Sequence, residues 1–304
     1  MNDVQQSTTR ERDILLPDGR TLHVYDRGGD GVPVIWHHGT PNVGTPPRPL
    51  ITLADELGLR WVSFDRPAYG GSSANPGRSV GSVARDVGVL ADALRLDAFA
   101  VFGHSGGGSH AVACAAEHGD RVLAVVSIAG LAPIDAHGLK WFDGMGPVGT
   151  AALRAAHEGV GGKRTPDDAT PDDATPDDAT PDDATPDATV DFIARDVETL
   201  AGPWGWLGEV VTAGLLTGKD GLIDDDIAYV TPWRVDLGAI AAPVLLLHGG
   251  KDRVVPATHS RWLRATLPTS EYWHHADDGH LSVLDVAERG ADDALRWVAE
   301  RAAR

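Results

Sequence analysis

The sequence predicts an α/β protein with a mostly parallel central sheet, flanked by helices and interrupted by an inserted, mainly helical segment. Short apolar runs typical of buried strands alternate with longer segments of helical periodicity through most of the chain. Several of these runs are apolar throughout, which indicates strands covered on both faces. The alternation stops between about residues 133 and 236 and then resumes, so we expect one core built from two stretches of chain.

The core is expected to begin with a hairpin, because residues 12–16 and 21–26 are strand-like and Pro17-Asp18-Gly19 between them favours a turn. Further strands are expected at 32–37, 59–64, 98–102, 122–128, 243–248 and 270–274. Helices are expected at 48–58, 79–95, 106–118, 256–266 and 281–302. Such alternation places parallel strands side by side with helices on both faces of the sheet.

We therefore divide the chain into a core of residues 1–132 and 236–304 and a cap inserted at 133–235. The cap holds four of the nine tryptophans, which are Trp141, Trp204, Trp206 and Trp233. These side chains either line a substrate pocket or pack the cap against the core, and packing is the usual role of large apolar residues.

Residues 165–189 repeat the pentapeptide TPDDA, with nine aspartates and no lysine or arginine. Proline at nearly every fifth position forbids a continuous helix, and no side chain larger than alanine offers apolar surface to bury. The sequence therefore predicts a disordered, extended acidic loop within the cap.

The formal net charge is −18, half of it contributed by the TPDDA repeat, and this acidity argues against nucleic acid or an anionic membrane surface as a partner. We find no apolar stretch of membrane-spanning length and no signal peptide in the polar N-terminus. The single cysteine, Cys114, rules out an internal disulfide and fits a reducing compartment. We expect a cytoplasmic protein that acts on a small molecule, and the sequence leaves its oligomeric state open.

Ser105 lies at the centre of the sequence GHSGG, between an expected strand and an expected helix. G-x-S-x-G in this context is the pattern of a nucleophile elbow, a strained turn that lifts a serine hydroxyl above the sheet. The glycines do not spell a dinucleotide fingerprint or a phosphate-binding loop. We therefore predict Ser105 as a nucleophile, the alternative being a structural serine in a glycine-rich turn.

A serine hydroxyl needs a base, and the base needs a group that orients it. Among 13 histidines, His280 follows the last expected strand, and Asp252 follows the strand before it. The carboxyl ends of parallel strands meet at one edge of a sheet, so both side chains are expected near Ser105. Asp277 and Asp278 are alternative orienting groups, although their closeness to His280 in sequence favours a role in the turn.

Acyl transfer also needs hydrogen-bond donors for the oxyanion. The segment His38-Gly39-Thr40-Pro41 follows an expected strand, and proline has no N–H, so a donor there must be Gly39 or Thr40. We predict the N–H of Thr40, paired with the N–H of Gly106 at the start of the next helix. His104, inside the elbow, is a candidate for contact with substrate.

Two stretches of the sequence contain several residues of the types that bind metal ions. The aspartate pairs of residues 165–189 lack the glycine turn and the closing glutamate of an EF-hand loop. The stretch HHADDGH at 274–280 matches no established spacing of metal ligands. No metal is therefore expected at either place.

Five motifs, taken in order, resemble the α/β-hydrolase fold family: HGTP (38–41), FDRPAYGGSS (64–73), GHSGGG (103–108), GGKDRVVP (249–256) and DDGH (277–280). The similarity is greatest to capped serine esterases and peptidase-like members with an HGxP oxyanion loop. It covers residues 1–132 and 236–304, whereas the cap is the variable part of that family. The resemblance implies no cofactor and no metal, and loop-ordering roles for Asp65, Arg66 and Ser72.

The sequence therefore predicts a serine hydrolase acting on a small ester, an amide or a lactone, with Ser105 as nucleophile, His280 as base and Asp252 as its orienting group. The same residues would also serve cofactor-free perhydrolysis, or a C–C or cyanohydrin lyase reaction. Relatives with an aspartate nucleophile, such as haloalkane dehalogenases and epoxide hydrolases, are disfavoured by the serine at position 105. A non-catalytic ligand-binding relative is the remaining alternative, against which the full set of catalytic residues argues.

Overall fold

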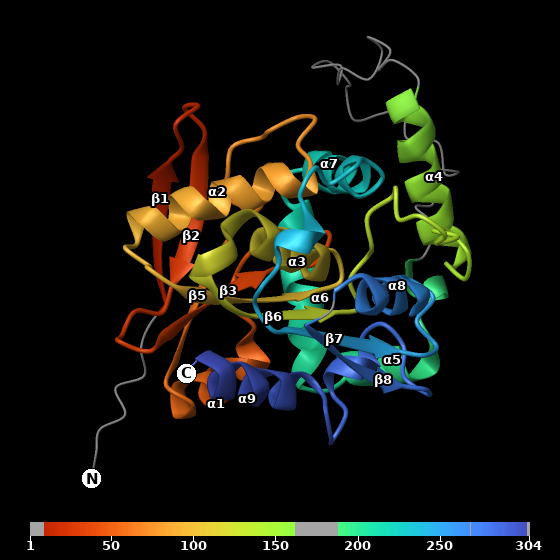
Figure 1. The fold of residues 1–304 in the computed structure, drawn as a ribbon. Helices are drawn as coiled ribbons and strands as arrows, with labels where there is room; N and C mark the ends of the chain where they lie inside the picture. The colour runs from red at the N-terminus through yellow and green to blue at the C-terminus, as the bar shows by residue number, and fades with distance from the viewer. Residues whose placement is uncertain (1–8, 162–187, 268, 303–304) are drawn as a thin grey trace.

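The computed structural model describes residues 9–161, 188–267 and 269–302. Within these residues, eight strands form one sheet in the order β1-β2-β4-β3-β5-β6-β7-β8 (Figure 1). The hairpin of β1 and β2 is antiparallel and joins β4 in antiparallel fashion, and every other neighbouring pair is parallel. The strands are β1 (Arg10–Leu15), β2 (Thr21–Asp26), β3 (Val32–His37), β4 (Leu59–Phe64), β5 (Phe99–His104), β6 (Val122–Ile128), β7 (Val244–Gly249) and β8 (Ser270–His275).

Helices cover both faces of the sheet, as the sequence predicts. In Figure 1, α2, α3 and α8 lie on one side of the strands and α1 and α9 on the other. The helices are α1 (Ile51–Glu56), α2 (Val80–Ala93), α3 (Gly106–His118), α4 (Pro147–Gly161), α5 (Ala194–Leu200), α6 (Trp206–Leu215), α7 (Asp220–Tyr229), α8 (Thr258–Thr266) and α9 (Ala291–Ala302).

The apolar strands of the sheet are buried on both faces, because the side chains of each strand belong to two separate apolar clusters. In β5, Val101 belongs to the apolar cluster that includes α2, α3 and α8, whereas Ala100 and Phe102 belong to the cluster that includes α1 and α9. Alternation along one strand therefore fills two cores, and a run that is apolar throughout is the expected pattern. The predicted fold class is confirmed.

The last helix is shorter than predicted. A helix was expected over residues 281–302, but α9 begins at Ala291 and residues 282–284 form only a single 3₁₀ turn. Arg289 has φ of 58°, which no right-handed helix accommodates, and its N–H donates to Asp293 Oδ2 at 2.7 Å. This break frees the segment around His280 from helical geometry and lets it form a loop at the sheet edge.

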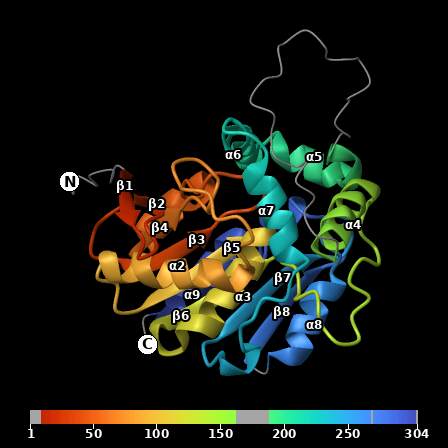
Figure 2. The same ribbon diagram turned by 90° about the horizontal axis from the view of Figure 1, so that it is seen from above.

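The segment between β6 and β7 is mainly helical, and Figure 2 shows α4, α5, α6 and α7 grouped on one side of the molecule. Its four tryptophans are all buried in the apolar clusters, and the ring centroid of Trp206 lies 6.4 Å from that of Trp36 in β3. The interpretation that they pack the segment against the core is confirmed. The boundaries of the cap at 133 and 235 stay a prediction.

The predicted loop of TPDDA repeats lies outside the described residues, apart from residues 188 and 189 at its end. Among the described helices, none is both long and apolar enough to cross a membrane. Cys114 is buried in α3, and this burial raises the pKa of its thiol.

Candidate active site

Ser105 occupies the turn between β5 and α3, the strand–turn–helix context that the sequence predicts. Its backbone has φ of 58° and ψ of −131°, a region that residues other than glycine rarely adopt. Two backbone hydrogen bonds hold this turn, from Ser105 N to Ile128 O and from Gly108 N to Ser105 O, each 2.8 Å long. A methyl group on Gly107 would overlap the carbonyl group of His37, so β3 and α3 approach this closely only because position 107 is glycine.

Asp252 and His280 meet at the carboxyl edge of the sheet. Nδ1 of His280 lies 2.8 Å from Oδ2 of Asp252, and both side chains are almost completely buried. Oδ1 of Asp252 accepts the backbone N–H groups of Val254 at 2.9 Å and Val255 at 2.8 Å, so the carboxylate is fixed on both sides. Nδ1 of His280 therefore carries its proton toward Asp252, and Nε2 is left as the nitrogen available to accept one.

Ser105 approaches this pair through its neighbour. The ring of His104 lies 4.9 Å from the ring of His280, measured between centroids. Within the described part of the chain, the hydrogen bonds do not include one between the Ser105 hydroxyl and His280. His280 is therefore hydrogen-bonded directly to Asp252. Ser105 is the residue next to His104, whose ring contacts the ring of His280.

The alternative orienting carboxylates are engaged elsewhere. Asp277 is exposed and pairs with Lys251 Nζ at 2.7 Å. Asp278 pairs with Arg195 Nη2 at 3.2 Å. Of the three carboxylates that the sequence offers, Asp252 is the one whose hydrogen bond to His280 is found in the described residues.

Electrostatics favour a charged Asp252 beside His280. Burial opposes ionisation of Asp252, but the charge and hydrogen bonds of His280 and His248 hold the pKa of Asp252 below its ordinary value. Burial likewise opposes protonation of His280, but the charges of Asp252 and Asp196 and the hydrogen bond to Asp252 raise the pKa of His280 above its ordinary value of 6.5. The site is therefore built to stabilise an imidazolium.

We expect the acid limb of the pH profile of kcat/KM to report His280. Because a general base must be neutral, kcat/KM falls as pH is lowered through a pKa that lies above 6.5. In an Asp252→Asn variant, the pKa of His280 itself is expected to fall, because the main group that raises it has been removed. Ester hydrolysis by the wild type from pH 5 to 9 locates the limb, and NMR titration of the imidazole in both proteins measures the shift; a pKa of His280 unchanged in the variant would contradict it.

Asp196 of α5 is a residue that sequence reasoning missed. Its Oδ1 accepts the N–H groups of Leu281 and Ser282, each at 2.8 Å, and its Oδ2 accepts the N–H of His280 at 3.3 Å. The carboxylate fixes the backbone on which His280 is mounted. Nothing in residues 194–200 distinguishes Asp196 from an ordinary acidic residue on a helix surface.

His104 lies against His280. Its side chain is almost completely buried, and its Nε2 is 2.9 Å from the carbonyl oxygen of His280. Burial and the nearby His280 lower the pKa of His104 to about 3, so it is neutral and donates this hydrogen bond. The idea that His104 contacts substrate stays a prediction.

The loop of residues 38–41 adjoins the nucleophile. A Cβ atom on Gly39 would lie 3.6 Å from Cβ of Ser105. Gly106 is the first residue of α3, so its N–H has no acceptor within the helix. No backbone acceptor for the N–H of Thr40 is found in the described residues. The assignment of the N–H groups of Thr40 and Gly106 to the oxyanion stays a prediction.

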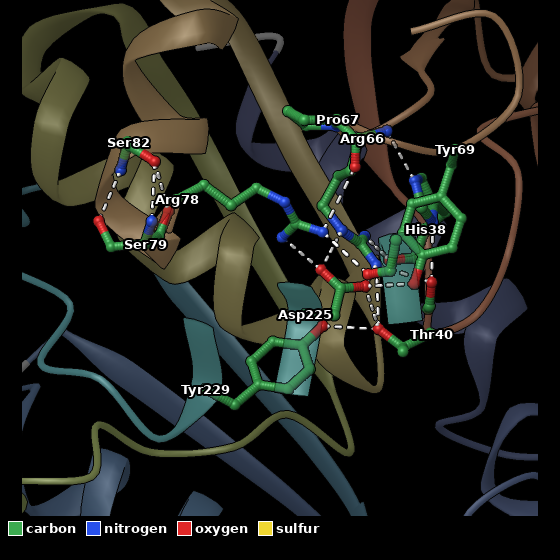
Figure 3. Close-up of polar contacts among 12 residues, drawn as sticks. His38, Thr40, Arg66, Pro67, Tyr69, Arg78, Ser79, Ser82, Asp225 and Tyr229 are labelled. Atoms are coloured by element: carbon green, nitrogen blue, oxygen red, sulfur yellow. Dashed lines mark hydrogen bonds and ion pairs between the residues drawn. The ribbon is translucent and has the colours of Figure 1, made fainter. Parts of the chain in front are cut away.

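A buried ionic cluster supports this loop (Figure 3). Oδ1 of Asp225 accepts from Arg66 Nε at 3.1 Å and Arg78 Nη1 at 2.6 Å. Oδ2 accepts from Arg66 Nη2 at 2.6 Å, Tyr69 OH at 2.9 Å and Thr40 Oγ1 at 2.6 Å. The side chains of Asp225, Arg66 and Arg78 have no exposed surface. Asp225 belongs to α7 of the inserted segment, and it too was missed from the sequence.

The segment after β4 orders its surroundings in the way that the family resemblance implies. Arg66 donates to the carbonyl groups of His38 and Gly39, the latter at 2.8 Å. Asp65 accepts the N–H of Gly44 at 2.6 Å, and Ser72 donates to the carbonyl oxygen of Asp65 at 2.7 Å. These contacts tie the segment at 64–73 to the loop beside Ser105.

Asp225→Asn is expected to lower the free energy of unfolding by about 3–5 kcal/mol, because it leaves Arg66 and Arg78 buried without a compensating charge. The matched control is Asp92→Asn, which removes a largely exposed carboxylate paired with Arg121 and should cost at most about 1 kcal/mol. Urea denaturation followed by circular dichroism measures both. Equal losses in the two variants would contradict the structural role given to Asp225.

No group of three or more His, Cys, Asp or Glu side chains in the described residues is arranged to bind a metal ion. The mixed sheet, the turn at Ser105 and the Asp252–His280 pair together define the class of α/β hydrolases. Residues 32–156 match the model of the family described as the alpha/beta hydrolase fold. The fold is that of the α/β hydrolases, and the resemblance predicted from the motifs is confirmed.

The chain is similar to several known proteins, to some over its whole length and to others over part of it. A 2-hydroxymuconate semialdehyde hydrolase from Pseudomonas putida is 26% identical over 99% of this chain and 98% of its own length. A non-heme chloroperoxidase from Streptomyces lividans is 31% identical, over 40% of this chain and 45% of that protein. The structure of a thermophilic esterase from Thermogutta terrifontis, 20% identical, superposes with a TM-score of 0.66 over 96% of this chain and 99% of that one. The last comparison shows the shared fold.

Proposed function

We propose that this protein is a serine hydrolase that cleaves a small ester through an acyl-enzyme. The observation that carries the proposal is the 2.8 Å hydrogen bond between Asp252 and His280, because it fixes the imidazole in the tautomer that a general base requires. The strained turn at Ser105 supports it, since such turns present a nucleophile at this edge of the sheet.

In the first half of the reaction, Oγ of Ser105 attacks the carbonyl carbon of the ester, and Nε2 of His280 takes its proton. Asp252 stabilises the imidazolium that results, and remains ionised throughout. The N–H groups of Thr40 and Gly106 bind the oxyanion of the tetrahedral intermediate. His280 then returns the proton to the leaving alcohol, and the acyl group stays on Ser105.

In the second half, water attacks the acyl carbon while His280 takes one of its protons. Collapse of the second tetrahedral intermediate releases the carboxylic acid, and His280 returns the proton to Ser105. An amide or a lactone would follow the same steps, with an amine or the ring hydroxyl as leaving group.

Perhydrolysis is a second candidate, favoured by the similarity to the chloroperoxidase over 40% of this chain. Hydrogen peroxide would then take the place of water in attacking the acyl-enzyme, and a peracid would leave in place of the acid. The same residues would act in both reactions, so only the second nucleophile differs.

The proposed function is tested by treating the protein with a fluorophosphonate probe and, separately, with p-nitrophenyl acetate, butyrate and octanoate. Labelling confined to the peptide containing Ser105, together with release of p-nitrophenol, is the expected result. Peracid formation from acetate and hydrogen peroxide, measured in the same preparation, tests the second candidate. The proposal fails if the folded protein is neither labelled nor active on any ester.

A further inference from the structure

One turn of α7 reaches the loop beside Ser105 with two side chains. Asp225 and Tyr229 are four residues apart on this helix, so they project from the same face. Both contact the Thr40 hydroxyl, which lies 2.6 Å from Asp225 Oδ2 and 2.7 Å from the Tyr229 hydroxyl (Figure 3). The inserted segment is therefore bonded directly to a residue whose N–H is a proposed oxyanion donor.

The Tyr229 hydroxyl also lies against the second proposed donor. A Cβ atom on Gly106 would overlap this hydroxyl and would lie 3.1 Å from Oγ1 of Thr40. Glycine at position 106 thus leaves the space that Tyr229 fills. A single helical turn contacts both Thr40 and Gly106, the two residues whose N–H groups must be spaced to hold one oxygen atom.

The direction of the hydrogen bonds follows from the chemistry of the groups. The guanidinium groups of Arg66 and Arg78 keep the buried Asp225 ionised, so this carboxylate only accepts. Thr40 has one hydroxyl hydrogen, and it goes to Asp225. Oγ1 of Thr40 then accepts from Tyr229 and, at 3.0 Å, from Nη2 of Arg66. Every hydrogen-bonding position of the Thr40 hydroxyl is occupied, so the side chain is held in one orientation.

We propose that Asp225 and Tyr229 are positioning residues, which hold the N–H groups of Thr40 and Gly106 at the spacing that the oxyanion requires. The inserted segment thereby acts on the chemical step and not only on access of substrate. This inference rests on the proposed function, because it assigns these N–H groups to the oxyanion of acyl transfer.

Thr40→Val tests the link, since valine keeps the shape and the backbone N–H but lacks the hydroxyl. We expect kcat to fall by about 10- to 100-fold, less than the ~10²–10³ that loss of a whole donor costs, with KM changed by less than about threefold. Thr40→Ser keeps the hydroxyl and should retain kcat within about threefold. Asp225→Asn is unsuitable here, because its expected loss of stability would mask the effect on rate.

Tyr229→Phe is expected to lower kcat in the same direction. The kcat of the double variant Thr40→Val/Tyr229→Phe should lie within about twofold of that of Thr40→Val, because both changes break the same hydrogen bond. The matched controls are Thr212→Val on the exposed side of α6 and Tyr272→Phe in β8, whose hydroxyls lie outside this network. Both controls should have the kcat of the wild type.

Affinity for a trifluoromethyl ketone separates positioning of the oxyanion donors from a general structural effect, because the ketone forms an oxyanion on Ser105. Its affinity should fall in parallel with kcat/KM in Thr40→Val, while the acid limb of the pH profile, which reports His280, stays in place. Wild-type kcat in Thr40→Val, equal losses in Thr40→Ser, or unchanged ketone affinity would each overturn the inference alone. Failure of the fluorophosphonate probe to label the wild type would overturn the proposed function and this inference together.

Discussion

Ser105→Ala is expected to lower kcat for the best ester substrate by about 10⁴- to 10⁶-fold and to abolish labelling by a fluorophosphonate. Alanine removes the atom that forms the acyl-enzyme but leaves the turn and the N–H groups of Thr40 and Gly106 intact. The small rate that remains reflects water attacking directly on a bound substrate. Stopped-flow and long-term assays on the same ester measure both ends of this range.

Ser109→Ala is the matched control. It alters the next serine of the same glycine-rich stretch, whose hydroxyl is hydrogen-bonded to the backbone of Leu131. Its folded protein should be labelled and should turn over esters at close to the wild-type rate. A Ser105→Ala protein that keeps more than about a tenth of the wild-type kcat would show that another group is the nucleophile.

Asp252→Asn is expected to lower kcat by about 10⁴-fold at pH 7. The asparagine amide would present a donor to Nδ1 of His280, so the imidazole would turn its proton toward Ser105 and lose the capacity to accept one there. The loss should be smaller at high pH if residual activity depends on solvent hydroxide, and a pH series on one ester measures this.

Asp277→Asn serves as the control, because Asp277 lies three residues from His280 but is exposed and paired with Lys251. It should retain kcat within about twofold. A large loss in Asp277→Asn, with little effect of Asp252→Asn, would show that Asp277 orients His280 and that Asp252 does not.

The parts of the site that depend on strand ends could be predicted from the sequence. Ser105 follows an apolar strand and precedes a small-residue helix, so local pattern alone identifies its turn. Asp252 follows β7, and His280 lies in the loop after β8; the rule that parallel strands end at one edge brings them together. Predicting these three residues required no knowledge of how the inserted segment packs.

The contributions of α5 and α7 could not be predicted, because they depend on how a segment without a regular pattern packs on the core. Residues 224–226 are all aspartate, and the sequence does not show which of them faces Arg66. The phase of α7 selects Asp225, and that phase is set by the packing of Ala228 and Tyr229 into the apolar cluster beside α3. The same reasoning applies to Asp196, whose carboxylate is 84 residues away in sequence from the His280 N–H that it binds.

The ion pairs of Asp225 connect the inserted segment to the core of the protein. Arg66 and Arg78 belong to the core, and the one carboxylate between them comes from α7. Removing α7 would take away the carboxylate that compensates both guanidinium groups, so the core is expected to lose stability with it. We therefore expect the two parts to unfold in one cooperative transition, and we expect a segment exchanged from a relative to fit best where its helix brings a carboxylate to the same place.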